Sequence, residues 1–310
     1  MRFGIKTGQG GYTYNELSSI WSKAEELGFD SAWLYDHFIA LGNPNNPCLE
    51  AYSTLGALAR DTHRINLGVM VTCAGYRNPS LLAKIAATVD VISNGRLIMA
   101  LGAGWYEEEY KAYGYAYLPN AERVRQLRET IKILKIMWNE TSSTYQGRYF
   151  SIQNTTSFPK PVQKRLPIWV GISAGTKTLP AVAVKEADGF NTMSDLETCG
   201  QILGRAEDVR KDLGRNRNEV TYSLQRYLMT GSEQQLTKLA EEGAKKAGTT
   251  PEQFTKRMKE RGCIMGSPEE CAQIIRSYTQ AGIDYFIPII VGDRLLWPIE
   301  VVRDKLVPLL

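Results

Sequence analysis

The stretch ISNGRLIMALGAGW, residues 92–105, decides the fold of this chain. It predicts a helix that ends at Asn94-Gly95, an apolar strand over residues 97–101, and a glycine loop at residues 102–104. Glycine ends helices and permits backbone conformations that other residues avoid. The stretch therefore predicts a helix followed by a buried strand that opens into a loop.

The same alternation of apolar strands and amphipathic helices repeats along the chain. The predicted strands are residues 2–6, 31–35, 65–71, 97–101, 168–170, 189–191, 221–229 and 285–291. The predicted helices are residues 14–27, 50–60, 79–93, 121–138, 176–185, 197–213, 268–282 and 299–307, with a hairpin at residues 144–152. Eight such units in 310 residues favour a closed (β/α)8 TIM barrel over an open doubly wound sheet.

One segment does not fit the repeat. Residues 232–262 are rich in Glu, Lys, Gln and Ala, which is typical of helices rather than of a strand with its loop. We expect a helical insertion between the seventh strand and its helix. The whole chain, residues 1–310, is then expected to form a single barrel domain.

Composition excludes several classes of protein. With 43% hydrophobic and 23% charged residues, the chain can bury a sizeable core. Its net charge of +4 comes from basic and acidic residues that are mixed along the chain, which does not suggest nucleic-acid or membrane-surface binding. The absence of a secretory leader pattern and of any long apolar run predicts a cytoplasmic protein.

Cysteine and histidine are poorly placed for a metal or disulfide framework. The five cysteines are scattered without a Cys-x-x-Cys pair, and the chain has two histidines, His37 and His63. We therefore expect no metal site.

If the barrel is correct, the residues that follow each strand meet at one rim, where barrel enzymes place their chemistry. Asp36-His37 puts a carboxylate beside a group that titrates near neutrality, although such a dipeptide alone is more often a surface turn. Residues 171–177 lead from a strand into a helix whose free N–H groups could hold a phosphate, or could form a plain turn. The run Glu107–Glu109 is typical of a solvated helix start.

Motifs along nearly the whole chain carry a resemblance. They are Ser93–Arg96, Gly102–Trp105, Glu107–Tyr110, Tyr113-Gly114, Glu122-Arg123, Gly147–Phe150, Pro167–Gly171, Lys177–Leu179, Ala187–Asn191, Gly266–Glu270 and Ala281-Gly282. In this order they resemble the luciferase-like monooxygenase superfamily. The resemblance implies a (β/α)8 barrel with a late insertion, commonly assembled as a homodimer.

The superfamily divides into enzymes that use reduced FMN with oxygen and enzymes that use the 8-hydroxy-5-deazaflavin coenzyme F-420. The segment Tyr35-Asp36-His37-Phe38 is similar to the Asp-His-Phe or Asp-His-Tyr motif of the deazaflavin branch. The resemblance implies that Asp36 lies against the deazaflavin ring. It also implies that His37 lies near the reactive ring carbon as a proton-transfer residue.

Further cofactor contacts follow from the same resemblance. Met70 and Val71 match the position of a non-proline cis peptide that backs the ring, a bond so unfavourable that we expect it for a functional reason. Ring and ribityl contacts are implied for Cys73, Ala103, Gly104 and Glu108. The loop implied to bind the cofactor phosphate is Ser173, Ala174, Gly175 and Thr176.

Two departures from the family pattern narrow the activity. Trp105 stands where the sugar-phosphate dehydrogenases of this branch have a glutamate, and Lys6 stands where methylene-tetrahydromethanopterin reductase has an acidic residue. Neither activity is therefore expected here.

These observations predict an oxidoreductase that transfers a hydride between F-420 and a small organic substrate. Two alternatives stay open. The first is an FMN-dependent monooxygenase that uses reduced flavin and oxygen, with a separate flavin reductase as its partner. The second is a non-catalytic flavin-binding barrel.

Overall fold

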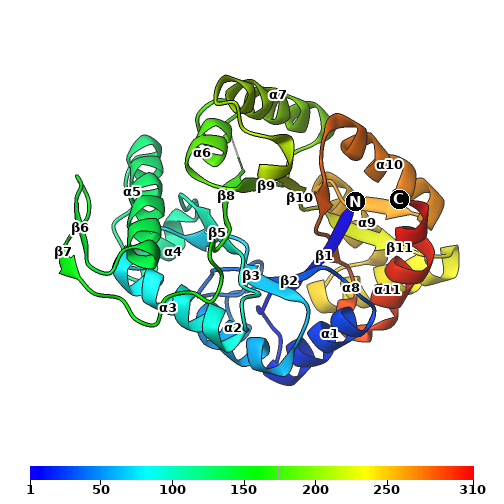
Figure 1. Cartoon of the computed structure of the whole chain (residues 1–310). Helices are drawn as coiled ribbons and strands as arrows, with labels where there is room; N and C mark the ends of the chain where they lie inside the picture. The colour runs from blue at the N-terminus through cyan, green and yellow to red at the C-terminus, as the bar shows by residue number, and fades with distance from the viewer. Residues whose placement is uncertain (174) are drawn as a thin grey trace.

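A ring of parallel strands forms the centre of the molecule in the computed structural model, which describes residues 1–173 and 175–310. The ring is seen end-on in Figure 1. Its strands are β1 (Arg2–Lys6), β2 (Ser31–Leu34), β3 (Asn66–Val69), β4 (Thr72–Cys73), β5 (Met99–Gly102), β8 (Ile168–Ile172), β9 (Gly189–Thr192), β10 (Thr221–Leu224) and β13 (Tyr285–Phe286).

The strands follow the order β3-β2-β1-β13-β10-β9-β8-β5-β4, and each neighbouring pair is parallel. The two ends of this order, β3 and β4, are successive pieces of one strand that is interrupted at Met70-Val71. A parallel bridge between Leu67 and Leu97 brings β3 next to the chain that leads into β5. The sheet therefore comes close to full closure as a TIM-like barrel, which confirms the predicted architecture.

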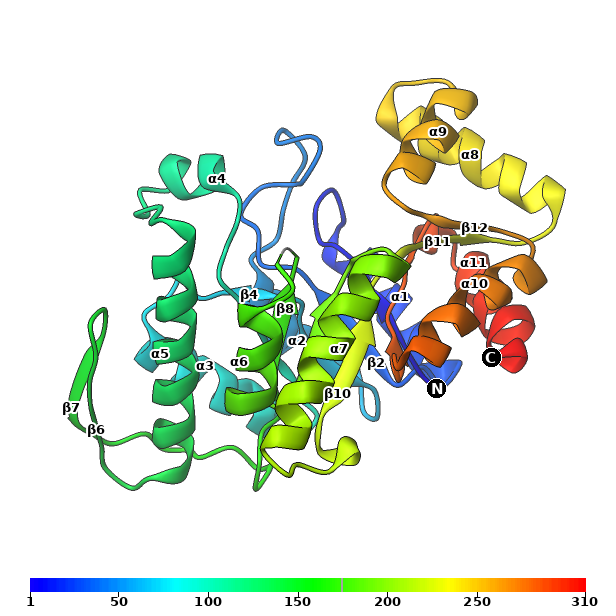
Figure 2. The ribbon, with the colours of Figure 1, turned by 90° about the horizontal axis from the view of Figure 1, so that it is seen from above.

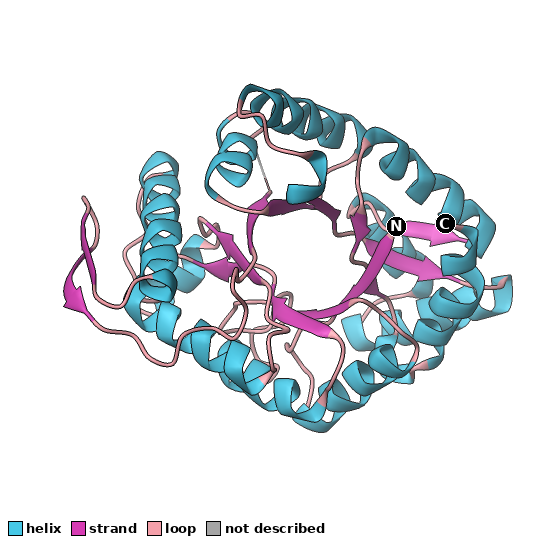
Figure 3. Ribbon diagram, in the orientation of Figure 1, coloured by secondary structure: helices cyan, strands magenta, loops and turns pink. Residues whose placement is uncertain are grey.

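Helices surround the ring on its outer side, as Figure 3 shows in cyan. They are α1 (Tyr14–Glu26), α2 (Ala51–Asp61), α3 (Pro79–Ile92), α4 (Glu107–Ala112), α5 (Asn120–Asn139), α6 (Thr178–Glu186), α7 (Leu196–Asp212), α10 (Pro268–Ala281) and α11 (Trp297–Val301). Capping boxes start α1 at Thr13 and α10 at Ser267, where side chain and backbone satisfy each other's exposed hydrogen-bonding groups.

Two predicted strands are broken. The expected strand at residues 221–229 consists of β10 and β11 (Tyr227–Thr230), and the one at residues 285–291 consists of β13 and β14 (Ile289–Ile290). Pro288 lies at the second break, where it has no N–H to donate to a ladder. Together with β12 (Ile264–Gly266), the outer pieces form a three-stranded parallel sheet in the order β12-β11-β14.

Helices α8 (Glu233–Ala247) and α9 (Pro251–Glu260) lie between β11 and β12 in the chain. Leu239 and Ala240 of α8 pack with Met229 of β11 in a small apolar cluster. In Figure 2 the two helices stand together at the upper right, at the same end of the barrel as α4, which lies at the upper left. The hairpin of β6 (Ser143–Gln146) and β7 (Ser151–Thr155) projects near α5.

Large side chains fill the interior of the barrel. Trp33 and Trp169 stack with ring centroids 5.3 Å apart, and Tyr285 meets Trp169 edge to face. Ile98, Ala100, Met70 and Ile287 complete this buried inner cluster. The barrel is thus a packed core rather than a pore, and room for chemistry is left at its rim. No helix in residues 1–173 and 175–310 is both long enough and apolar enough to cross a membrane.

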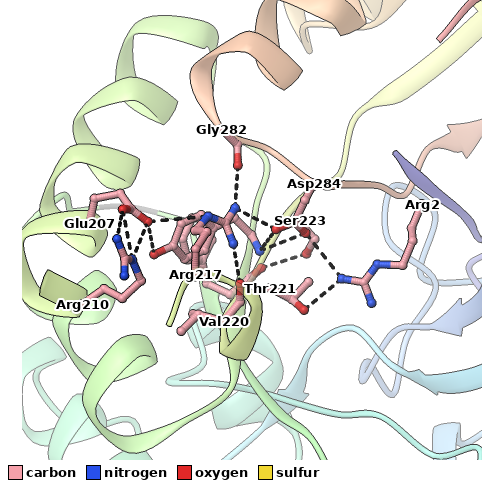
Figure 4. Close-up of polar contacts among 11 residues, drawn as sticks. Arg2, Glu207, Arg210, Arg217, Val220, Thr221, Ser223, Gly282 and Asp284 are labelled. Atoms are coloured by element: carbon pink, nitrogen blue, oxygen red, sulfur yellow. Dashed lines mark hydrogen bonds and ion pairs between the residues drawn. The ribbon is translucent and has the colours of Figure 1, made fainter. Parts of the chain in front are cut away.

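A network of charged side chains joins the strand starts at the opposite end of the barrel, and Figure 4 shows its contacts. Arg217 donates to Asp284 (2.7 Å), to the carbonyl of Gly282 (2.9 Å) and to the carbonyl of Val220 (2.6 Å). Its guanidinium also lies 4.0 Å from the ring centroid of Tyr222. Arg217 therefore fastens the start of β10 to the loop before β13.

We expect Arg217→Ala to lower the free energy of unfolding by about 1–2 kcal/mol, because two carbonyls and a carboxylate lose their donor at a half-exposed site. Urea unfolding with an unchanged m-value would measure this. Arg125, in an exposed pair with Glu122 on α5, is the matched control, and Arg125→Ala should cost about 0.5 kcal/mol or less. Equal losses for the two variants would contradict the assigned role of Arg217.

Candidate active site

Asp36 and His37 follow β2 directly at the rim. The Asp36 carboxylate is buried, with 4% of the residue exposed. It accepts two hydrogen bonds from the Arg77 guanidinium, at 2.7 and 2.9 Å, and one from the Cys73 N–H at 2.9 Å. A two-pronged pair of this kind fixes both partners. Asp36 therefore ties the end of β2 to the end of β4 and to the loop that carries Arg77.

Glu109, on α4, is the centre of a second cluster. Its carboxylate accepts from His37 Nδ1 (2.7 Å) and from the Tyr76 hydroxyl (2.7 Å) through one oxygen. The other oxygen accepts from the backbone N–H groups of Phe38 (2.6 Å) and Ile39 (3.2 Å). The residue is fully buried, so these donors replace the water that a carboxylate would otherwise need.

The protonation of Glu109 decides the state of His37. Burial by itself would raise the pKa of Glu109, but the hydrogen bonds from His37, Tyr76 and Phe38 outweigh burial and hold its pKa below the ordinary value. An ionised carboxylate can only accept, so His37 Nδ1 must be the donor. The ring atom left for proton transfer is then His37 Nε2.

Aromatic rings line the rim beside His37. Trp105 stacks on Tyr106 with centroids 5.0 Å apart, and its ring meets the His37 ring edge to face at 5.8 Å. Trp105 is 59% exposed, which is unusual for a tryptophan. Phe38, from the loop after β2, packs against Tyr76 and Tyr115, and Tyr110 of α4 belongs to the same cluster.

The interruption between β3 and β4 shapes the neighbouring part of the rim. The peptide between Met70 and Val71 is cis, as the family resemblance implies. A Cβ atom on Gly102 would lie 2.6 Å from Val71 Cγ2, and one on Gly171 would lie 2.8 Å from the same atom. Glycine at both positions therefore lets Val71 reach between β5 and β8 and leaves a wall without bulky side chains there.

Cys73 and Gly104 lie next to this wall. The Cys73 thiol is 2.8 Å from the Tyr110 hydroxyl, and burial raises the pKa of the thiol to about 12. Gly104 has φ +80°, and a Cβ there would collide with the Tyr110 hydroxyl. Gly104 is thus required both by its backbone conformation and by its neighbour. Ala103 is partly buried beside it.

The predicted phosphate loop follows β8. Ser173, Gly175 and Thr176 lie between β8 and α6, while Ala174 lies outside the described residues. Gly175 has φ +83°, and α6 begins without a side-chain cap on its N–H groups. Uncapped N–H groups at the start of a helix suit an anion.

Most of the site residues named from the sequence meet at this end of the barrel. Ala174 lies outside the described residues, and Glu108 is exposed on α4, whereas its neighbour Glu109 is buried at the centre of the cluster. The expectation that residues 107–109 form a solvated helix start is therefore wrong for Glu109, because four donors compensate its burial. Sequence reasoning also missed Arg77 and Tyr76, for which no motif gives a signal.

We expect Glu109→Gln to lower the free energy of unfolding by about 1–3 kcal/mol. The NH2 group of the new side chain would face a buried donor that now has a carboxylate oxygen as its acceptor. The His37 ring should also lose its fixed tautomer, which ¹⁵N chemical shifts of the ring report. His63 is the one other histidine, so assignment is direct. Glu108→Gln is the control and should change neither reading. A His37 tautomer unaffected by Glu109→Gln would contradict the role of Glu109.

A parallel barrel with polar and aromatic side chains gathered at the carboxyl ends of its strands is typical of barrel enzymes. Sequence comparison identifies the family. The chain belongs to the luciferase-like monooxygenase family, whose sequence pattern it matches over residues 1–285.

The individual relatives share about a quarter to a third of their aligned residues with this chain. The chain is 31% identical to the F-420-dependent glucose-6-phosphate dehydrogenase of Microbacterium testaceum, over 71% of this chain and 66% of that protein. It is 25% identical to the enzyme of the same name from Segniliparus rotundus, over 99% and 97% of the two chains. For the relatives matched first, the aligned segment spans from about half to two thirds of their own length.

Solved structures show the same fold. The F-420-dependent secondary alcohol dehydrogenase in complex with an F-420-acetone adduct superposes with a TM-score of 0.84 over 99% of this chain and 98% of that one. Its sequence identity is 19%, so the likeness concerns the architecture.

Proposed function

We propose that this protein is an oxidoreductase that transfers a hydride between coenzyme F-420 and a small organic substrate. The observation that carries the proposal is His37, held by the buried Glu109 at the barrel rim with its Nε2 atom left for proton transfer. Relatives named for F-420 dependence support the choice of cofactor.

The residues at the rim fit a deazaflavin. The wall formed by Val71, Gly102 and Gly171 carries no bulky polar group that would oppose a flat ring. The uncapped start of α6, with Ser173 and Thr176 before it, suits the cofactor phosphate. Asp36 would act through position rather than by accepting a proton, because its carboxylate is already bound by Arg77 and the Cys73 N–H.

Hydride chemistry is what the deazaflavin supplies when it is bound. The chain itself must orient the reacting carbon atoms, exclude water and move one proton. In this proposal His37 Nε2 exchanges that proton with the oxygen or nitrogen of the substrate. Glu109 keeps Nδ1 protonated, since an ionised carboxylate at 2.7 Å can only accept a hydrogen bond.

Trp105 distinguishes this site from that of a sugar-phosphate dehydrogenase. An exposed indole stacked on Tyr106 offers an apolar face next to His37, and it cannot act as an acid or base. The proposal therefore does not extend to glucose 6-phosphate. Helices α8 and α9, the proposed insertion after the seventh strand, lie at the same end of the barrel as α4, and we propose that they close over the rim.

We expect His37→Ala to lower kcat about 10²–10⁴-fold while F-420 affinity changes little, because a proton-transfer residue acts in the transition state. The substrate for this assay is the most active compound in a screen of small alcohols, aldehydes and ketones with F-420. Affinity is measured separately by quenching of protein fluorescence. His63→Ala, at an exposed histidine, is the matched control. An unchanged kcat in His37→Ala would rule out the proposed role.

A further inference from the structure

Lys6 is a basic side chain at the rim that the proposed reaction does not use. It ends β1, whose alternate residues face the barrel interior: a Cβ on Gly4 would meet Ser31 and Ile287, and Lys6 lies two residues further on. Around the barrel, three strands lie between β1 and β8 in either direction, if β3 and β4 are counted as one strand. Lys6 therefore lies across the barrel mouth from Gly171.

The surroundings of Lys6 hold a surplus of hydrogen-bond donors. Lys6 Nζ donates to Gln225 Oε1 at 3.0 Å, and no carboxylate lies within 4.0 Å of it among the described residues. Gln225 is 2% exposed, and its amide nitrogen donates to the thioether of Met193 at 3.2 Å. Sulfur is a weak acceptor, so the buried amide nitrogen of Gln225 lacks a strong acceptor, and the Lys6 ammonium beside it has N–H donors beyond the one that Gln225 Oε1 accepts.

Three carboxylates of the rim have partners other than Lys6. Asp36 is bound by Arg77, Glu109 by His37, and Asp293 by the hydroxyl of Tyr12 at 2.6 Å. Arg77 and Arg294, in turn, have the acidic partners Glu50 and Glu16. Among the described residues, the ammonium of Lys6 thus has no acidic partner.

We propose that Lys6 and Gln225 form a subsite for a carboxylate group, so that the substrate of the proposed oxidoreductase is a small organic acid. The identification of the ligand as the substrate rests on the proposed function, whereas the carboxylate subsite does not depend on it. A carboxylate has two acceptor oxygens for the two donors, and its single negative charge matches one ammonium. A phosphate monoester carries up to two negative charges and would be only partly neutralised.

Burial is consistent with this role. Lys6 keeps some exposure to the barrel mouth, yet burial lowers its pKa to about 7, and no neighbouring charge contributes to the shift. Since lysine in the unfolded chain titrates near 10.5, the unfolded state binds more protons between pH 7 and 10.5. The destabilisation caused by Lys6 is therefore full below pH 7 and fades as the pH rises toward 10.5.

The test is a pH titration of protein labelled with ¹³C at the lysine ε-carbon, in which the Lys6 signal is identified by its loss in Lys6→Met. We expect a midpoint near pH 7 that 50 mM acetate raises by about one unit, which corresponds to a Kd of about 5 mM for the ammonium form. Acetamide, which has no charge, should leave the midpoint unchanged, and inorganic phosphate should shift it less than acetate. No effect of acetate, or a larger effect of phosphate, would overturn the proposal.

The same titration with F-420 bound separates substrate from cofactor. Acetate should still raise the midpoint in the loaded protein. If F-420 alone raised it and abolished the effect of acetate, Lys6 would belong to the cofactor site and the substrate assignment would be wrong. If F-420 did not bind at all while acetate still acted on Lys6, the proposed function would fail and the carboxylate subsite would stand.

Thermal unfolding gives a second reading without any ligand. Lys6→Met should raise Tm by about 2–5 °C at pH 6 and by less at pH 10, because it removes an uncompensated buried charge. Lys111→Met, at an exposed lysine on α4, is the matched control and should leave Tm unchanged. A fall in Tm for Lys6→Met at pH 6 would show that Lys6 stabilises the fold, which contradicts a site kept for a ligand.

Discussion

The buried carboxylate of Glu109 is the interaction on which the arrangement of the rim depends. A charged group removed from water is tolerated only if hydrogen bonds replace its hydration. Glu109 obtains these from His37, Tyr76 and two backbone N–H groups after β2. Three segments that are distant in the chain are thereby held as one body. The same contacts fix the tautomer of His37, so the stability of the rim and its chemistry share one cause.

A second carboxylate extends this arrangement. Asp36 joins the end of β2 to Cys73 and Arg77, and Arg77 also reaches Glu50 before α2. Asp36 is therefore paired with a guanidinium, whereas Glu109 is held by hydrogen-bond donors. Lys6 has no carboxylate within 4.0 Å among the described residues, so a ligand that reaches it meets an ammonium without an acidic partner. Electrostatics of this kind favour an anionic ligand over a neutral one.

The barrel was predictable from the sequence because its signals are local. Short apolar strands and amphipathic helices repeat, and Asn94-Gly95 ends a helix at the expected place. The breaks that divide β10 from β11 and β13 from β14 were missed. The two chains bend together there: Ile289 N–H donates to the Arg226 carbonyl and Val291 N–H to the Leu228 carbonyl. A bend shared by two strands is a tertiary feature that neither strand shows alone.

The site was predictable only in part, for a related reason. Asp36 and His37 stand out because they follow a strand, and the family resemblance points to Met70 and Val71. The sequence of three consecutive glutamates does not predict that Glu109 is buried while Glu108 is exposed to solvent. That choice depends on Tyr76 and His37, which reach Glu109 from other loops. The contact between Lys6 and Gln225, 219 residues apart, is equally invisible in the sequence.

Titration of the purified protein with oxidised F-420 and, in parallel, with FMN tests the central claim most directly. Quenching of protein fluorescence reports binding without any knowledge of the substrate. The account predicts saturable binding of F-420 at micromolar or lower concentration and none of FMN in the same range. Saturable binding of FMN without F-420 would contradict it, and would assign His37 and Glu109 to an enzyme that uses reduced flavin and oxygen.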